Sequence, residues 1–378
     1  MVFKHLCRIC LSSSPSKPSV SAFSILVPLR QTGRARREET CQGGGIGSGP
    51  WPLAGRLTRD ARIALDRPQN IKEPCPIFPI CYQQQSVKEM KTYAHEVDLS
   101  EPAKQSAKLV EHEDLSEALK RLVFSRDLTS PDDVRTEVIK QAKDYPISNL
   151  FGASVIDGAG RVTSHLGGIA GTGADETAEI EGRMFRHAAQ FIWAFRAQAF
   201  IEPARRQIWL QHTPQERELD FLVVNNPFVP SGHEGIFTRG LYYGLCGDML
   251  LAAHLLAPQI ENSLRYVLES NGVDISNLES DLTQPVKTLG PLLSLPQTAA
   301  IFGADCVFEL RGLLIEKLGY SFRHRVAHGF VSEAECYSAP GSNLWWIALR
   351  LCYTPLALRE INATTPTPES KSEKSAEK

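Results

Sequence analysis

The sequence has little net charge, no long hydrophobic run and no regular cysteine spacing. The net charge is −2, so any contact with RNA or DNA would have to come from a local basic patch. The longest apolar stretches, 241–256 and 344–358, are interrupted by Asp248, His254 and Arg350, too early for a membrane-spanning helix. We therefore expect a protein that makes no contact with a membrane.

The nine cysteines do not show the spacing of a disulfide framework. Four of them lie in apolar stretches: Cys246, Cys306, Cys336 and Cys352. A buried free thiol is the simplest interpretation of each. The pairs at 7 and 10 and at 75 and 81 do not match a zinc finger. We expect a reducing, cytoplasmic compartment and no bound metal.

Phosphate-binding loops are also missing. Two glycine-rich runs, 43–49 and 167–173, lack the preceding strand, the lysine and the acidic partner that a nucleotide-binding loop requires. We interpret both runs as flexible loops and expect no cofactor. No internal repeat is present, and 378 residues are enough for two or three domains with cores of their own.

The two ends of the chain differ in composition from the middle. Residues 1–89 are rich in proline, glycine, serine and arginine and show no sustained periodicity, so we expect a disordered leader. Met90 is the first methionine after Met1, and a wrongly assigned start codon is our favoured explanation of this leader over a transit peptide. Residues 358–378 are predicted to form a disordered tail.

Residues 90–225 are predicted to form an α-rich domain with a single β-hairpin. Ser100 and Ser130 are candidate N-caps, and they indicate two or three helices between 100 and 144. The apolar segments 151–156 and 161–165 flank a glycine-containing turn and predict the hairpin.

A long helix is predicted over 175–199. Its apolar positions recur at helical spacing and predict a core-facing stripe. The stripe consists of Phe185, Ala188, Ile192, Phe195 and Ala199. Arg183, Arg186 and Arg196 lie off this stripe; they could contact phosphates, but we expect them to face solvent, as most helix arginines do.

The segment 225–235, rich in proline and glycine, predicts a domain boundary, and residues 230–357 predict a helical domain. Helices are expected over 247–270, 304–318 and 343–358. The fold class is therefore mainly α, a helical bundle preceded by a helical domain with one small β-hairpin.

One segment, Arg323-His324-Arg325-Val326-Ala327-His328-Gly329, combines residue types suited to chemistry on a phosphate. An arginine can bind two phosphate oxygens with its planar fork, and histidine can transfer protons near neutral pH. A neutral imidazole can remove the 2′-OH proton of RNA without a metal, a reaction closed to DNA. Positions 323 and 328 are about 140° apart on an ideal helix, so Arg323 should lie at the start of its helix.

The helix expected over 247–270 carries a polar stripe that can face this motif. His254, Pro258, Glu261 and Arg265 recur at steps of four, three and four residues. Pro258 is expected to kink the helix, and Glu261 to orient His328 or Arg323. In the structural alternative, Glu261 and Arg265 form an ordinary intrahelical pair, and the motif residues only fix helix packing.

The string RHRVAHG is similar to the RNxxxHG signature of the domain of unknown function 4209 family. Arg323, His328 and Gly329 match it, and His324 stands where asparagine is usual. Gly247-Asp248, Pro258 to Asn262 and Arg265 resemble that family's other helix, so the likeness covers about residues 240–351. It also extends to the wider HEPN superfamily, and it implies an HEPN-like bundle, metal-independent RNase activity and action as a homodimer.

The motif and the resemblance together predict an endoribonuclease or RNA-binding protein, in RNA degradation or defence, that acts as a homodimer with two motif copies facing a shared groove. His328 is the expected general base or acid, kept neutral by a helix N-terminus, and Arg323 is the expected phosphate clamp. The expected supporting residues are His324, Glu261, Arg265, His254, Asp248 and Gly329. The alternative is a non-catalytic interaction module in which these residues are structural.

Overall fold

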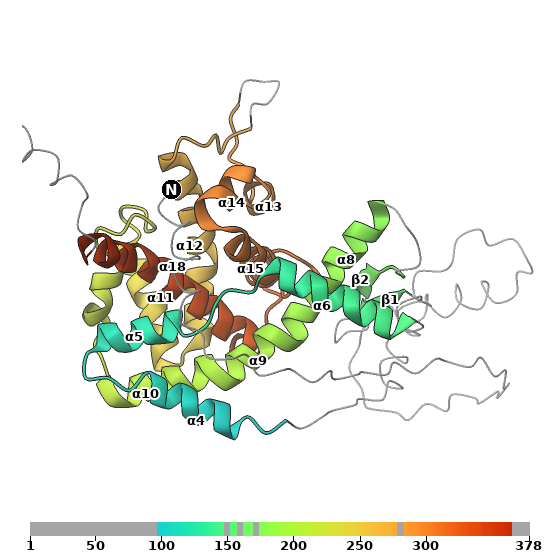
Figure 1. Cartoon of the computed structure of the whole chain (residues 1–378). Helices are drawn as coiled ribbons and strands as arrows, with labels where there is room; N and C mark the ends of the chain where they lie inside the picture. Colours follow the sequence, from blue (N-terminus) through green and yellow to red (C-terminus); the bar gives the residue numbers. More distant parts are fainter. Residues whose placement is uncertain (1–96, 147–151, 157–161, 169–173, 278–282, 365–378) are drawn as a thin grey trace, which may run out of the picture. The chain divides into compact units, whose positions relative to one another are not determined.

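Helices make up most of the computed structural model, which describes residues 97–146, 152–156, 162–168, 174–277 and 283–364 (Figure 1). Within these ranges, the strands β1 (Ala153–Ile156) and β2 (Val162–Leu166) form one small antiparallel hairpin. The predicted fold class, mainly helical with one hairpin, is confirmed. The predicted leader, the hairpin turn, the first glycine run, most of the second and residues 365–378 of the predicted tail lie outside the described residues.

Three helices lie between residues 100 and 144, as predicted: α4 (Ser100–Leu109), α5 (Leu115–Phe124) and α6 (Pro131–Asp144). Ser130 caps α6, because its hydroxyl accepts a hydrogen bond from the backbone N–H of Asp133 at 3.3 Å. The predicted capping role of Ser100 is wrong. Ser100 is the first helical residue of α4, and its own N–H donates to the carboxylate of Asp98 at 2.9 Å.

The predicted long helix is an unbroken succession of α-helical and π-helical segments. Its parts are α8 (Ala174–His187), π-helical η2 (Ala188–Trp193), α9 (Ala194–Arg196), π-helical η3 (Ala197–Ile201) and α10 (Glu202–His212). Each π turn holds more residues than an α turn, so the following side chains are rotated from their α-helical positions. Phe195, predicted in the core, is therefore 44% exposed, and Arg196, predicted in solvent, is buried.

Arg196 forms a buried ion pair with Glu309. Its Nη1 and Nη2 donate to the two carboxylate oxygens at 2.6 and 2.8 Å, and its Nε donates to Asn343 at 2.9 Å. Glu309 also accepts from the backbone N–H and the hydroxyl of Thr129. Burial disfavours the charged carboxyl, but Arg196 and Thr129 outweigh it and hold the pKa of Glu309 below its usual value. This cluster ties four chain segments together inside the protein.

Within the described residues, the second half of the chain contains four longer helices and several short ones. The longer helices are α11 (Glu234–Cys246), α12 (Met249–Ser270), α15 (Ala304–Leu314) and α18 (Ala339–Thr364). The short ones are the 3-10 helix η4 (Glu216–Leu222), α13 (Leu289–Leu293), α14 (Pro296–Phe302), α16 (Phe322–Ala327) and α17 (Glu333–Cys336). The prediction for 247–270 is confirmed. Helix α15 ends four residues early, and α18 continues to Thr364, so residues 358–364 of the predicted tail are helical.

The larger of two hydrophobic core clusters runs through most of the described chain, and the smaller one lies among α6, α8, η2 and α15. Helix α12 packs against α11 and α18 (Figure 1). Trp345 and Trp346 of α18 are fully buried. The larger cluster contains Leu122 of α5, and Phe228 and Val229 of the segment predicted as a domain boundary. Residues on the two sides of 225–235 therefore share one core.

Two further findings bear on the environment of the protein. None of the described helices combines the length and the apolar character that crossing a membrane requires. The thiols of Cys246, Cys336 and Cys352 are free, as predicted; Cys306, Cys336 and Cys352 are buried, and Cys246 is partly exposed.

Candidate functional site

The motif from Arg323 to Gly329 folds as the short helix α16 followed by a glycine stop. Gly329 has a φ of +68°, which glycine adopts without the steric cost that a side chain imposes. The N–H of Phe330 donates to the carbonyl of Arg325 at 2.8 Å, and that of Gly329 to Val326 at 3.1 Å. These two hydrogen bonds form a Schellman motif. The role of Gly329 is therefore to end α16 and to direct the chain onward.

Glu261 connects α12 to α16. Its buried carboxylate pairs with Arg265, one turn along the same helix, and lies 2.5 Å from Nε of Arg323. Arg265 also donates through Nε to the carbonyl of Lys287 at 3.2 Å. The prediction that Glu261 orients Arg323 agrees with this geometry, and within the described residues we find no contact between Glu261 and His328.

Arg323 is only partly engaged by this contact. Its side chain is 32% exposed, and Glu261 meets it at Nε. Within the described ranges, no hydrogen bond or ion pair joins the two Nη groups to another residue. The guanidinium thus forms an ion pair with Glu261 at Nε, and the Arg323 side chain remains partly accessible to a ligand.

His324 and His328 lie on the exposed side of α16. Their ring centroids are 4.5 Å apart, as expected for residues one helical turn apart. Partial desolvation lowers the pKa of His324, and the nearby charges of His328, Arg323 and Lys317 lower it further. His324 is consequently neutral over a wider pH range than a free imidazole.

The predicted helix N-terminus beside His328 is wrong. His328 is the C-cap of α16, at the opposite end of the helix from the expected one, and its N–H donates to the carbonyl of His324 at 3.2 Å. The cause is the glycine stop, which closes the helix directly after His328. Arg323, in contrast, lies in the first turn of α16, as the angular spacing predicted.

Phe330 and Glu335 belong to the same surface and were not among the predicted site residues. The Phe330 side chain is 64% exposed, and its ring lies 5.9 Å from that of His328 at an angle of 26°. Glu335 pairs with Arg325 at 2.5 Å and forms a capping box with Ser332 at the start of α17. The serine-to-glutamate spacing of a capping box is readable in the sequence, whereas the exposure of Phe330 is not.

The other predicted supporting residues lie apart from the motif. Asp248 caps α12 by accepting from the N–H of Leu251 at 3.0 Å. His254 is exposed, and its Nδ1 lies 2.8 Å from the carbonyl of Leu250. Where the chain is described, no hydrogen bond, ion pair or ring contact joins either of them to the motif. Among the described residues, the predicted polar stripe of α12 thus reaches α16 through Glu261, and Arg265 pairs with Glu261 on the same helix.

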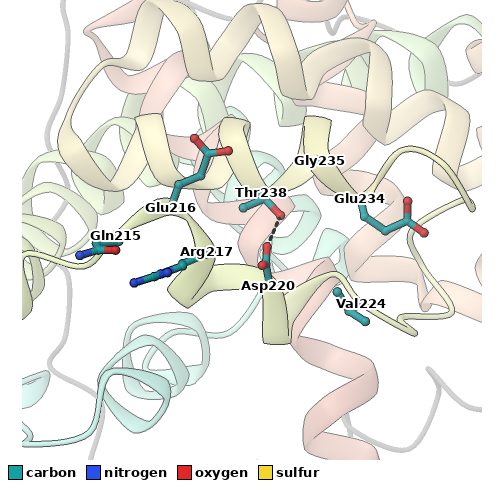
Figure 2. Close-up of a pocket in the computed structure, with 8 residues that line it drawn as sticks. All are labelled: Gln215, Glu216, Arg217, Asp220, Val224, Glu234, Gly235 and Thr238. Carbon is teal, nitrogen blue, oxygen red and sulfur yellow. Dashed lines mark hydrogen bonds between the residues drawn. The ribbon is translucent and has the colours of Figure 1, made fainter.

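An open hollow of about 440 Å³ lies elsewhere, between η4 and the start of α11 (Figure 2). Its lining residues are Gln215, Glu216, Arg217, Asp220, Val224, Glu234, Gly235 and Thr238. The hydroxyl of Thr238 donates to Asp220 at 3.2 Å, and three of the lining residues are acidic. Carboxylates repel phosphate groups, so this hollow is unsuited to the predicted RNA partner.

Comparisons with family models, with curated proteins and with solved structures give no match. The likeness to the HEPN superfamily therefore remains a prediction that rests on the motif. The geometry alone assigns to the α16 surface two adjacent imidazoles, two partly exposed guanidinium groups, each paired with a glutamate, and one exposed aromatic ring.

Proposed function

We propose that the α16 surface binds RNA and cleaves it by proton transfer, without a metal, as an HEPN-like endoribonuclease. The observation that carries the proposal is the pair of exposed imidazoles, His324 and His328, whose centroids are 4.5 Å apart beside Arg323. Two histidines can supply both the base and the acid that cleavage at a 2′-OH requires.

In the proposed reaction, neutral His324 removes the proton of the 2′-OH, and the oxygen attacks the adjacent phosphorus. The bond from phosphorus to the 5′-oxygen breaks, and the leaving oxygen takes a proton from protonated His328. The products are a 2′,3′-cyclic phosphate and a 5′-hydroxyl. The lowered pKa of His324 favours this division of roles, because the base must be neutral to act.

Arg323 is the proposed phosphate clamp. Glu261 fixes its Nε edge, so the remaining N–H groups are oriented before a phosphate arrives. Lys317 lies within electrostatic range of His324 and adds to the local positive charge. A homodimer in the cytoplasm, with two α16 surfaces facing a shared groove, completes the proposal.

The test uses the purified full-length chain, a 5′-labelled single-stranded RNA and an excess of EDTA. We expect cleavage to fragments ending in 2′,3′-cyclic phosphate, and no cleavage of DNA of the same base sequence. His328→Ala should lose at least about 10² in rate with an unchanged circular dichroism spectrum. His165→Ala, an exposed histidine on β2, is the matched control and should keep full activity.

A second candidate function is a non-catalytic interaction module, and the contact of Glu261 with both Arg265 and Arg323 favours it. This contact joins α12 to α16 in the way that ordinary packing does. If the wild-type chain neither binds nor cleaves RNA in EDTA, and Arg323→Ala lowers the melting temperature, the motif is structural. Loss of cleavage in His165→Ala as large as in His328→Ala would also contradict the catalytic proposal.

A further inference from the structure

Phe330 differs from an ordinary exposed apolar residue in its surroundings. A single exposed side chain needs no explanation. In a Schellman motif, however, the residue after the glycine commonly packs back against the helix, whereas Phe330 is 64% exposed and its ring lies nearly parallel to that of His328. The two rings are stacked at the end of α16, and the exposed Phe330 ring presents an aromatic surface there.

The backbone of Phe330 is held in place from both sides. Its N–H donates to the carbonyl of Arg325, and Nη2 of Arg325 lies 3.5 Å from the carbonyl of Phe330. Arg325 is itself paired with Glu335, whose other oxygen accepts from the N–H and the hydroxyl of Ser332. A group whose main chain is ordered in advance loses less conformational entropy on binding a ligand.

Besides the Arg325–Glu335 pair next to Phe330, two further cations lie toward the other end of the same row of rings. Phe330 neighbours His328, His328 neighbours His324, and His324 lies near Arg323 and Lys317. The row therefore runs from an aromatic surface to a cluster of cations. A nucleotide has the same order of groups, with a flat base at one end and a negative phosphate at the other.

We infer that Phe330 stacks on an unpaired base and thereby limits the α16 surface to single-stranded RNA; this rests on the proposed function. Proteins that bind single strands combine aromatic rings that stack on bases with cations that follow the phosphates. In a duplex the bases are already stacked on one another, and their faces are closed to Phe330. The phosphate next to the stacked base then lies at His324 and Arg323.

The test measures fluorescence anisotropy of a labelled 2′-O-methyl 12-nucleotide strand, which cannot be cleaved through its 2′-oxygen. The full-length wild-type chain should bind this strand more tightly than the same strand in a duplex. Phe330→Ala should weaken binding by about 5- to 150-fold, the range measured for loss of one stacked base. Phe330→Trp should bind within about twofold of wild type, because a larger ring preserves stacking.

Two controls keep the result specific to the aromatic ring. Phe330→Leu keeps an apolar side chain without a ring and should bind as weakly as Phe330→Ala. Phe195→Ala removes another exposed phenylalanine, outside α16, and should bind as wild type does. All variants should share the wild-type circular dichroism spectrum, since neither side chain is in the core.

The outcomes separate this inference from the proposed function. If Phe330→Ala or Phe330→Leu binds as wild type does while His328→Ala has lost cleavage, the stacking role is wrong and the nuclease proposal stands. If the wild-type chain binds neither strand nor duplex, both are wrong. If Phe330→Ala changes only self-association in light scattering, Phe330 belongs to a protein contact and the inference is overturned.

Discussion

Two arginine–glutamate contacts in this protein differ in how completely they are enclosed. In the Arg196–Glu309 cluster, Nε, Nη1 and Nη2 of the arginine and both carboxylate oxygens have partners within the core. In the Glu261–Arg323 contact, the carboxylate is buried but the arginine is partly exposed and meets Glu261 through Nε. The first contact leaves no group available to a ligand, whereas the second presents one.

The difference separates a structural ion pair from a candidate binding group. A buried charge is tolerated only when its hydrogen-bonding capacity is met, as it is for Arg196. An arginine held by one edge at the surface can still bind phosphate with its other edge. The following variants test this distinction, from the largest expected effect to the smallest.

Glu309→Ala should destabilise the protein by about 3–5 kcal/mol, because it leaves the charge of Arg196 buried and unpaired. Urea unfolding followed by circular dichroism measures the loss. The double variant Arg196→Met with Glu309→Leu removes both charges and should recover most of it. A double variant as unstable as the single one would show that the cluster contributes through shape rather than charge.

The same carboxylate gives a pH dependence. The pKa of Glu309 is lowered in the folded state, so its stabilising contribution is complete above the unfolded-state value and is lost as pH falls through the lower, folded-state value. Unfolding experiments below about pH 4.5 should show this loss in wild type and not in the double variant.

His324→Ala should lower RNA cleavage by about 10²-fold or more at neutral pH if His324 is the base. Because the pKa of His324 is lowered, wild-type cleavage should begin to fall only below about pH 6.5, the ordinary histidine value. The rate measured from pH 5 to pH 8 checks this. An acid limb centred above pH 6.5 would assign the base to another group.

Glu261→Ala should cost about 1–2 kcal/mol of stability, less than Glu309→Ala, because the two freed arginines can be solvated. Its larger effect should be on RNA, with cleavage reduced through the loss of Arg323 orientation. Glu269→Ala, at an exposed position of the same helix, is the control and should change neither quantity. A stability loss equal to that of Glu309→Ala would remove the distinction between the two contacts.

The Arg325–Glu335 pair should contribute least, with a coupling energy of about 0.2–1 kcal/mol. Both side chains are about one-third exposed, so water screens their attraction. A double-mutant cycle isolates this value from the capping role of Glu335. We expect the coupling to shrink further in high salt, and a salt-independent value would indicate a more enclosed pair.

Much of the helical architecture could be predicted from local signals. Proline at the start of α6, the cap at Ser130 and the glycine after α12 act within a few residues and are visible in the sequence. The Arg196–Glu309 pair could not be predicted, because its partners are 113 residues apart and the π turns change which face Arg196 occupies.

The candidate site could be predicted in its residues but not in its arrangement. The motif letters indicated Arg323, His324 and His328, and the helical spacing on α12 indicated Glu261. His328 lies at the C-terminal end of α16 because the helix stops at this point. Gly329, with its positive φ, ends the helix there. Phe330 follows this stop, so its exposure depends on tertiary packing that no local pattern records.

Because of the π turns between Ala188 and Ile201, the fold depends on the number of residues in the long helix. Removing one exposed residue there, such as Gln190, would rotate everything beyond it by about 100° about the helix axis. Arg196 would then point away from Glu309, although no contact residue had been changed. A length change of one residue in this helix should therefore be more damaging than most substitutions along it.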